Sequence, residues 1–251
     1  MRVTGVPLAG ILPDVRALRR AGRPAAYIIR RPLSASAEAF RSLRAHLAFA
    51  LPEEKSQIIA VTSAVPGEGK TLTSICLART YAAMGSQVVL LDCDLRRASA
   101  SKFFAKPKFG IAEIVTQSIP TDEALIHDSK SEIWFLAGSA TKNISGDVFS
   151  DDRIDDLLKE LARKFDKIII DTPPLLGFAE ARILASKADC VLHVIRWDNT
   201  PASTVHAAVR ILRQSNARLA GAVLNRVNMK RQAQYGYADG SDYYHHYGAA
   251  Y

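Results

Sequence analysis

The sequence contains few cysteines, and the three that it has form no recognisable framework. Cys76, Cys93 and Cys190 lie far apart, form no C-x-x-C pair, and each sits in an apolar run. This pattern excludes a disulfide scaffold and a cysteine-based zinc site. It predicts buried thiols in a reducing compartment, which we take to be the cytoplasm.

Long apolar runs are also missing. No stretch approaches the roughly 18 apolar residues that a membrane-spanning helix requires. Pro7 and Pro13 interrupt the short apolar stretch near the N-terminus, and no clear cleavage site follows it, which argues against a secretory signal. The composition, 48% hydrophobic and 23% charged, still provides enough apolar material for a core. A length of 251 residues predicts one large domain with tails.

Lysine is absent from the first 44 residues, where nine arginines are accompanied by only two acids. The net charge of +8 is therefore concentrated in this leading segment, and we assign residues 1–33 to a basic arm. Such an arm could adhere to an anionic membrane surface, bind nucleic acid through charge, or be solvated without a partner. Aromatic residues are rare in it, so we expect no nucleic-acid partner.

Branched aliphatic residues are absent from the last 17 residues, which read YGYADGSDYYHHYGAAY. Such a segment cannot bury enough apolar surface to offset its ordering entropy, so we predict that residues 229–251 form a flexible tail. The tail is either a generic low-complexity segment or a set of phenols presented to an enzyme. His245 and His246 are weak evidence for a metal site. The candidate phosphoacceptors are Tyr235, Tyr237, Tyr243, Tyr244, Tyr247 and Tyr251.

Between the tails, short apolar runs alternate with helical patterns. Unbroken apolar strands that alternate with helices are typical of a mostly parallel sheet covered on both faces. We therefore predict an α/β fold, with a single domain over residues 34–228 and ligands bound at the carboxyl ends of the strands. The predicted strands are 57–62, 88–91, 133–136, 167–170, 190–195 and 219–224, and the predicted helices are 71–84, 151–165 and 203–214.

A glycine-rich segment, Ala64-Val-Pro-Gly-Glu-Gly-Lys-Thr71, follows the first predicted strand and opens a helix. It matches a P-loop, in which backbone N–H groups surround phosphate oxygens and the helix N-terminus adds its dipole. We expect Lys70 to reach the β- and γ-phosphates and the Thr71 hydroxyl to ligate Mg²⁺. The fold is then that of a P-loop NTPase. Its expected nucleotide-binding residues here are Pro66, Gly67, Glu68, Gly69, Lys70, Thr71 and Leu72.

Carboxylates end two of the buried strands. Asp92 and Asp94 follow the run at 88–91, and Asp171 ends the predicted strand at 167–170, as the acid of a Walker B motif does. Two acids at one strand tip repel each other, so a Mg²⁺ ion or a proton must share the site. Beside a P-loop, this pattern predicts Lys70, Asp92, Asp94 and Asp171 as the catalytic group, with Thr71, Asp92 and Asp171 around the metal.

Four motifs together resemble bacterial tyrosine kinases, the autokinase modules of capsule and exopolysaccharide export systems. They are the Pro-Gly-Glu-Gly-Lys-Thr loop, the Leu-Asp-x-Asp-x-Arg strand, the Asp-Thr-Pro-Pro strand and the terminal tyrosines. Upstream of the P-loop, Glu38-x-x-Arg41-x-x-Arg44 is similar to the ring-forming helix motif of that family, and the three side chains share one side of a helix. The resemblance covers roughly residues 34–251.

The resemblance implies a protein-tyrosine kinase that uses ATP and Mg²⁺, with Asp92 activating the tyrosine hydroxyl and Asn225 contacting adenine. It implies a ring of identical subunits joined through Glu38, Arg41 and Arg44, in which one subunit phosphorylates the tail of the next. The expected partner is a membrane-embedded co-polymerase segment, fused upstream or separate. The expected location is the cytoplasmic face of the inner or plasma membrane, where the kinase regulates polysaccharide polymerisation and export.

Several positions depart from the usual pattern of that family. Ala98 and Ser101 replace a usual Pro and His, Glu180 replaces an Asp, and the run from Asn143 replaces Asn-Pro-x-Glu-Leu-Leu. One alternative is therefore a degenerate kinase that binds nucleotide as a regulatory scaffold. Another is an ATPase switch of the ParA/MinD type, although those proteins carry an additional P-loop lysine where this chain has Val65.

Overall fold

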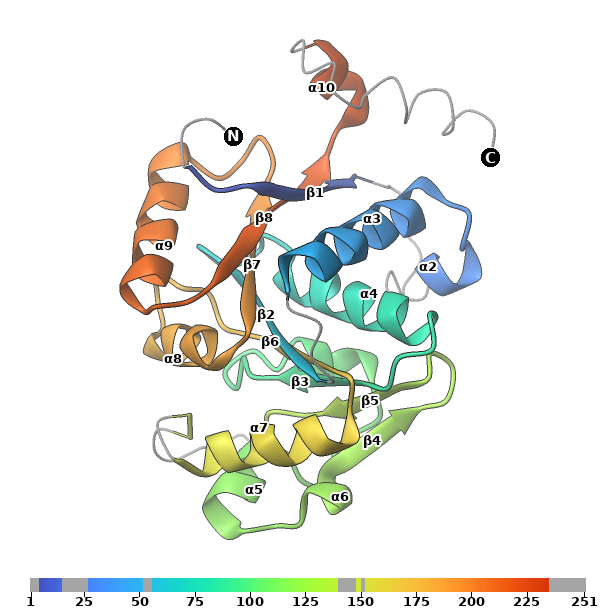
Figure 1. Ribbon diagram of the computed structural model, residues 1–251, viewed down its shortest axis with the longest axis vertical. Coiled ribbons are helices and arrows are strands. Elements are labelled where there is room, and N and C mark those ends of the chain that lie inside the picture. Colours follow the sequence, from blue (N-terminus) through green and yellow to red (C-terminus); the bar gives the residue numbers. More distant parts are fainter. Residues whose placement is uncertain (1–4, 15–26, 52–55, 140–147, 150–151, 235–251) are drawn as a thin grey trace.

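The computed structural model describes residues 5–14, 27–51, 56–139, 148–149 and 152–234. Its strands are β1 (Leu8–Pro13), β2 (Gln57–Ser63), β3 (Val88–Asp92), β4 (Leu125–Asp128), β5 (Ile133–Leu136), β6 (Lys167–Asp171), β7 (Cys190–Arg196) and β8 (Leu219–Val227). They form one sheet in the order β1-β8-β7-β2-β6-β3-β5-β4 (Figure 1). Every pairing is parallel except that of β4 with β5. The predicted α/β fold is confirmed.

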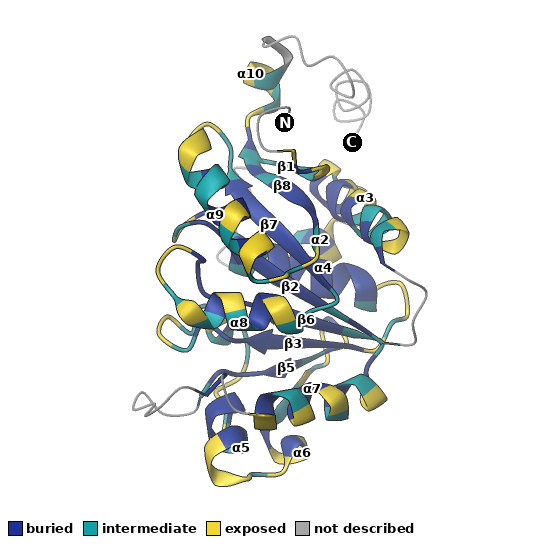
Figure 2. Ribbon diagram, turned by 60° about the vertical axis from the view of Figure 1, so that its left-hand side comes forward, coloured by how far each residue is buried: buried dark blue, intermediate teal, exposed yellow. Residues whose placement is uncertain are grey.

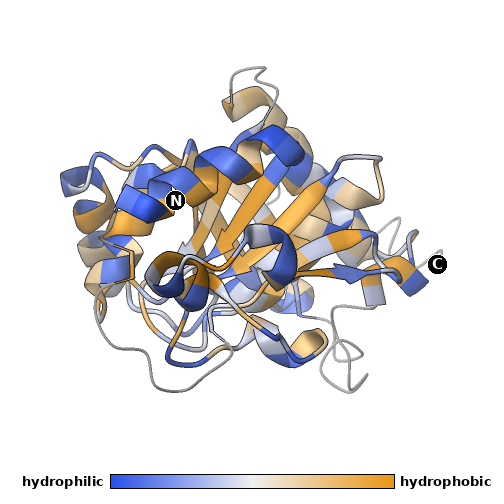
Figure 3. Ribbon diagram, turned by 90° about the horizontal axis from the view of Figure 1, so that it is seen from below, coloured by the Kyte–Doolittle hydropathy of each residue, from blue (hydrophilic) through white to orange (hydrophobic). Residues whose placement is uncertain are grey.

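Helices cover both faces of this sheet. They are α2 (Tyr27–Arg30), α3 (Ala35–Ala50), α4 (Lys70–Ala82), the 3₁₀ turn η2 (Ala100–Phe103), α5 (Ile111–Gln117), α6 (Thr121–Ala124), α7 (Asp152–Lys164), α8 (Ala179–Lys187), α9 (Ala202–Gln214) and α10 (Met229–Gln234). Helices α3 and α4 share one apolar cluster with the sheet, and α5, α7, α8 and α9 contribute to a second cluster. In Figure 3 the apolar strands lie between helices whose outer faces are hydrophilic.

The central strands are apolar on both sides because helices cover both sides. Val88–Leu91 are all fully buried, and each such side chain contributes roughly 1.5–3 kcal/mol through removal from water. Helix α7 buries Ile154 and Leu161 on one stripe and carries acids in its first turn and bases in its last. Its outward face is exposed in Figure 2. The predicted helix at 151–165 is confirmed with slightly tighter bounds.

The N-terminal segment differs from the prediction. Residues 1–33 were assigned to an arm outside the domain, but β1 pairs in parallel with β8 at the edge of the sheet and buries Ala9 and Leu12. Pro13 is tolerated there because an edge strand has one side that needs no ladder hydrogen bond. Helix α2 buries Ile28 against the domain. Residues 1–4 and 15–26 lie outside the described part of the chain.

The predicted flexible tail at residues 229–251 is wrong for its first six residues, which form helix α10. The tyrosine-rich segment 235–251 lies outside the described residues, so its flexibility remains a prediction. Among the described helices, none combines the length and the apolar character needed to cross a membrane.

Candidate active site

The P-loop connects β2 to α4 in the way the sequence predicts. Residues 64–69 turn between Ser63 and the first residue of α4, Lys70. Gly67 and Gly69 have φ angles of +85° and +100°, which side chains other than hydrogen rarely permit. A Cβ atom at Gly69 would also lie 2.0 Å from the amide nitrogen of Asn225. Both glycines are therefore required by the backbone of the loop.

The side chains of Glu68 and Asn225 form hydrogen bonds to the backbone of this loop. The Glu68 carboxylate is buried and accepts hydrogen bonds from the backbone N–H of Val65 (2.8 Å), the backbone N–H of Arg196 (3.3 Å) and the hydroxyl of Thr200 (2.5 Å). The Asn225 amide nitrogen donates to the Glu68 carbonyl oxygen (2.8 Å). Neither residue lines the cavity above the loop, although both were predicted to contact the nucleotide. Their side chains fix the shape of the phosphate-binding loop.

The predicted catalytic side chains converge at the tips of β3 and β6. Asp92 and Asp171 occupy paired positions on these adjacent strands. The Lys70 ammonium lies 3.0 Å from a carboxylate oxygen of Asp94 and 3.8 Å from one of Asp171. Burial raises the pKa of Asp171 to about 7, and the Lys70 charge opposes that rise. The structure thus brings together the lysine and all three acids.

Asp92 also has a hydrogen-bond partner, Ser101, that the sequence alone did not identify. One of its carboxylate oxygens accepts hydrogen bonds from the backbone N–H (2.9 Å) and the hydroxyl (2.8 Å) of Ser101. Burial raises the pKa of Asp92, and these hydrogen bonds oppose the rise. Ala98 in the same segment has a φ of +43°, which the proline usual in the resembling family cannot adopt. The segment after β3 therefore has a backbone conformation that alanine at position 98 permits and that proline at this position would not.

The acids have oxygens that suit Mg²⁺. One oxygen of Asp92 and one of Asp171 are buried without a hydrogen-bond partner among the described residues. The other Asp171 oxygen accepts a hydrogen bond from the Ser74 hydroxyl (3.3 Å), and the Thr71 side chain opposes the rise in the pKa of Asp171. Within the described segments, no group of three or more His, Cys, Asp or Glu residues could hold a metal alone. Magnesium commonly binds one or two carboxylates together with substrate phosphates and water. Thr71, Asp92 and Asp171 therefore fit a nucleotide-bound Mg²⁺.

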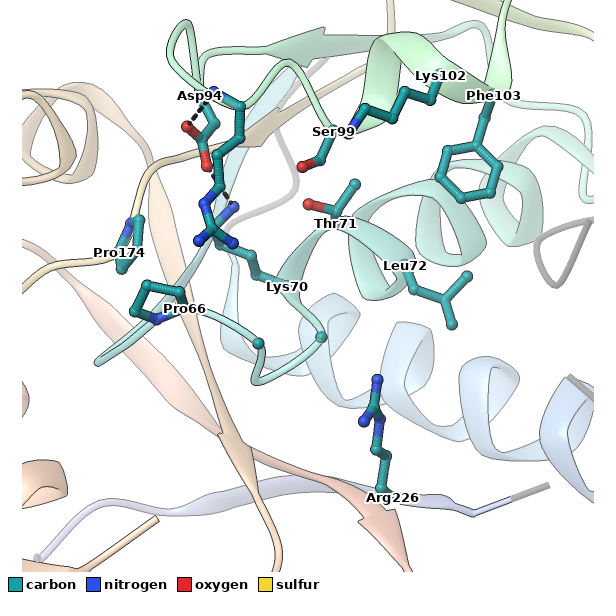
Figure 4. A pocket seen from close by; sticks show the side chains of 13 residues that line it. Pro66, Lys70, Thr71, Leu72, Asp94, Ser99, Lys102, Phe103, Pro174 and Arg226 are labelled. Atoms are coloured by element: carbon teal, nitrogen blue, oxygen red, sulfur yellow. Dashed lines mark hydrogen bonds and ion pairs between the residues drawn. The ribbon is translucent and has the colours of Figure 1, made fainter. Parts of the chain in front are cut away.

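A cavity of ≈ 380 Å³ lies above the P-loop (Figure 4). Lys70, Thr71 and Leu72 line it from α4, and Asp94 from the end of β3. Its lining also includes residues that the sequence analysis did not identify, which come from the segment after β3, the end of β6 and the end of β8: Arg97, Ser99, Lys102, Phe103, Pro174 and Arg226.

The predicted ring-interface residues lie on α3, away from this cavity. Arg41 donates to the Glu38 carboxylate (2.5 Å) and to the Pro32 carbonyl oxygen (2.7 Å). The Arg44 Nε atom is buried without a hydrogen-bond partner among the described residues. Its charge opposes the burial that raises the pKa of Tyr81. Glu38 and Arg41 thus form an outward ion pair, whereas part of the Arg44 side chain is directed into the domain.

Comparison with known proteins identifies the family. A model described as an AAA domain matches residues 56–220. The chain belongs to this family. It is 28% identical to the tyrosine-protein kinase YwqD of Bacillus subtilis over 207 residues, which cover 82% of this chain and 87% of that protein. It is 27% identical to the succinoglycan biosynthesis transport protein ExoP of Rhizobium meliloti, over 89% of this chain and 29% of that protein. The chain therefore spans less than a third of this larger relative.

Solved structures agree with this assignment. The kinase domain of the Escherichia coli tyrosine kinase ETK superposes with a TM-score of 0.83 at 27% identity, covering 89% of this chain and 91% of that domain. The resemblance to bacterial tyrosine kinases, and with it the expected enzyme class, is confirmed. A chain of the MinC:MinD cell division protein complex of Aquifex aeolicus, at 18% identity, has a TM-score of 0.60 over 71% of this chain and 72% of its own, which shows a shared fold alone.

Proposed function

We propose that this chain is an ATP-dependent tyrosine autokinase that phosphorylates the tyrosine-rich segment of a neighbouring copy. The observation that carries the proposal is the cavity above the P-loop, which Lys70 and Asp94 line together, with Asp171 of β6 3.8 Å from the Lys70 ammonium. A nucleotide-switch protein needs the loop and the metal ligands. A kinase also needs a carboxylate to receive a proton and an acceptor hydroxyl, and this chain has six tyrosines in its last 17 residues.

The residues of the site have distinct tasks in the transfer. Backbone N–H groups of the loop and the N-terminus of α4 bind the phosphates, and Lys70 stabilises the charge that develops on the transferred group. A bond forms between the tyrosine oxygen and the γ-phosphorus, and the bond from that phosphorus to the β–γ bridging oxygen breaks, which releases ADP. The phenol proton passes to Asp92, or to Asp94 at the cavity wall. Thr71, Asp92 and Asp171 would hold a Mg²⁺ ion, which would neutralise charge on the phosphates.

Relatives such as ExoP are named for polysaccharide transport, and this supports a role in regulating polysaccharide polymerisation and export. In this role the kinase assembles with itself through Glu38, Arg41 and Arg44 on α3. It works with a membrane-embedded co-polymerase segment at the cytoplasmic face of the membrane. These partners are proposals that follow from the kinase assignment.

Replacing the P-loop lysine tests the activity. Lys70→Met should reduce tyrosine phosphorylation by about 10²-fold or more, because the transferred phosphoryl group loses its main charge partner. Lys106→Met is the matched control, because Lys106 is exposed and does not line the cavity. The measurement is a phosphotyrosine blot after incubation with Mg·ATP, with mass spectrometry of residues 235–251.

Two results would contradict the proposal. Residual activity of Lys70→Met within tenfold of the unmodified chain would exclude the P-loop as the catalytic site. Nucleotide binding without any phosphotyrosine in the unmodified chain would favour the regulatory scaffold.

A further inference from the structure

The segment after β3 contributes two cations to the cavity wall whose side chains form no ion pair within the described part of the chain. Lys102 and Phe103, from η2, project toward the start of α4 in Figure 4, and Arg97, from the segment after β3, also lines the cavity. Among the described residues, neither Arg97 nor Lys102 forms an ion pair with an acid. Asp94 is the only acid among the lining residues, and it is paired with Lys70 at 3.0 Å. We call Arg97, Lys102 and Phe103 the cationic rim.

The location of the rim indicates which ligand it meets. Of the candidate proton acceptors, Asp92 ends β3 and Asp94 follows two residues later, so an acceptor phenol must reach the site from this side. Arg226 lines the cavity from β8, on the opposite side of the P-loop (Figure 4). The phosphates of a bound nucleotide already have the loop N–H groups, Lys70 and the metal as partners. The charges of the rim are therefore available for the acceptor.

The chemistry of the rim matches the tyrosine-rich segment of this chain. Residues 235–251 contain Asp239, Asp242 and six tyrosines, with no lysine or arginine. Phe103 is 37% exposed and offers an aromatic face against which a phenol ring can pack. Cations at the edge of a binding site select and orient ligands of opposite charge.

We propose that the cationic rim is the docking surface for the acidic tyrosine segment of a second copy, and that it gives the enzyme a preference for tyrosines flanked by acids. This inference rests on the proposed kinase function. A phosphorylated segment gains about 1.5 to 2 negative charges per phosphate at pH 7, so it should bind the rim more tightly than the unmodified segment.

Steady-state kinetics with a separate acceptor test the inference. The enzyme is the full chain with its six tail tyrosines changed to phenylalanine, and the acceptor is a peptide of residues 235–251. Lys102→Glu should raise the KM for the peptide by about tenfold, because one exposed attraction becomes a repulsion. The KM for ATP should stay within about twofold, since the rim binds the acceptor and the P-loop binds the nucleotide.

Two controls separate docking from a general loss of structure or charge. Lys106→Glu makes the same charge change at an exposed position nearby that does not line the cavity, and it should leave both KM values unchanged. A peptide with Asp239→Asn and Asp242→Asn should be a poorer acceptor for the parent enzyme, yet show little further loss with Lys102→Glu, because the two changes remove the same interaction.

The outcomes distinguish the two proposals. Equal peptide KM values for Lys102→Glu and Lys106→Glu, or a rise confined to the KM for ATP, would overturn the docking surface while the kinase function stands. No phosphorylation of the peptide by the parent enzyme would overturn both. Competitive inhibition by the phosphorylated peptide against the peptide but not against ATP would support the rim.

Discussion

His193 lies in the middle of β7, between Thr62 of β2 and Ala222 of β8. Its side chain is fully buried, and neither ring nitrogen has a hydrogen-bond partner among the described residues. Burial lowers the pKa of His193 to about 4, from a usual value of 6.5. A neutral imidazole therefore occupies a site where leucine would leave no polar atom unsatisfied.

His193→Leu should stabilise the protein by roughly 1–3 kcal/mol at neutral pH, because two unsatisfied buried nitrogens are removed. The pKa of His193 is lower in the folded state than in the unfolded state, so the unfolded state binds a proton more readily. The free energy of unfolding of the parent is therefore unaffected by this group above pH 6.5 and decreases as the pH falls toward about 4. Denaturant unfolding between pH 4 and pH 8 should show a shallower acid limb in the variant. His206→Leu, at a half-exposed position, is the control. A variant less stable than the parent at both ends of this range would show that the imidazole contributes to packing or bonding.

The residues of the active site differ in how far the sequence alone identifies them. Lys70, Asp94 and Asp171 each follow a strong strand pattern, and parallel strands bring their carboxyl ends to one edge, so their convergence could be predicted. The hydroxyl of Thr200 bonds to Glu68 from a segment 132 residues away, and the hydroxyl of Ser101 bonds back to Asp92 across the loop that follows β3. No local pattern contains those contacts, because they depend on the paths of two loops.

At the scale of elements, the buried centre of the sheet was predicted and its edges were not. Strands β2, β3, β6, β7 and β8 each contain an apolar run of at least three residues because helices cover both their faces. β1 contains Gly10 and ends at Pro13, and β4 includes His127 and Asp128, so neither has that pattern. Their pairing depends on a neighbour that the local sequence does not reveal.

Gly221→Val should therefore separate β1 from β8. A Cβ atom at Gly221 would lie 2.7 Å from the Cβ of Ala9 and 3.0 Å from the carbonyl oxygen of Pro7. We expect a loss of about 1–3 kcal/mol in unfolding free energy, as for other overpacked sites. Gly177→Val is the control, since a Cβ there meets nothing within 4 Å. Amide hydrogen exchange should locate the loss of protection in residues 8–13. Equal stability of the two variants would mean that β1 does not pack on β8 in solution.

At the scale of the whole molecule, the uneven charge suggests a surface of contact with membranes. The basic excess lies in the first 44 residues, yet β1 and α2 belong to the folded domain. Removing residues 1–33 would also delete the edge strand β1. A loss of membrane binding in that variant could then result from lower stability instead of from the lost charge. Arginine substitutions between β1 and α2 address the charge alone: Arg16, Arg19, Arg20 and Arg23.

Changing these four arginines to glutamine should weaken binding to phosphatidylserine-containing vesicles by at least about tenfold at low salt. Each arginine near an anionic surface contributes about 1 kcal/mol, and this attraction is screened as ionic strength rises. The matched control changes four exposed cations of the body, Lys106, Lys130, Arg182 and Arg210, to glutamine. Both variants have the same net charge, so a loss of co-sedimentation in the first alone places the contact between β1 and α2. Equal losses of co-sedimentation in both variants would indicate non-specific electrostatic attraction. No loss in either variant would contradict the membrane contact, because these charges would then contribute nothing to vesicle binding.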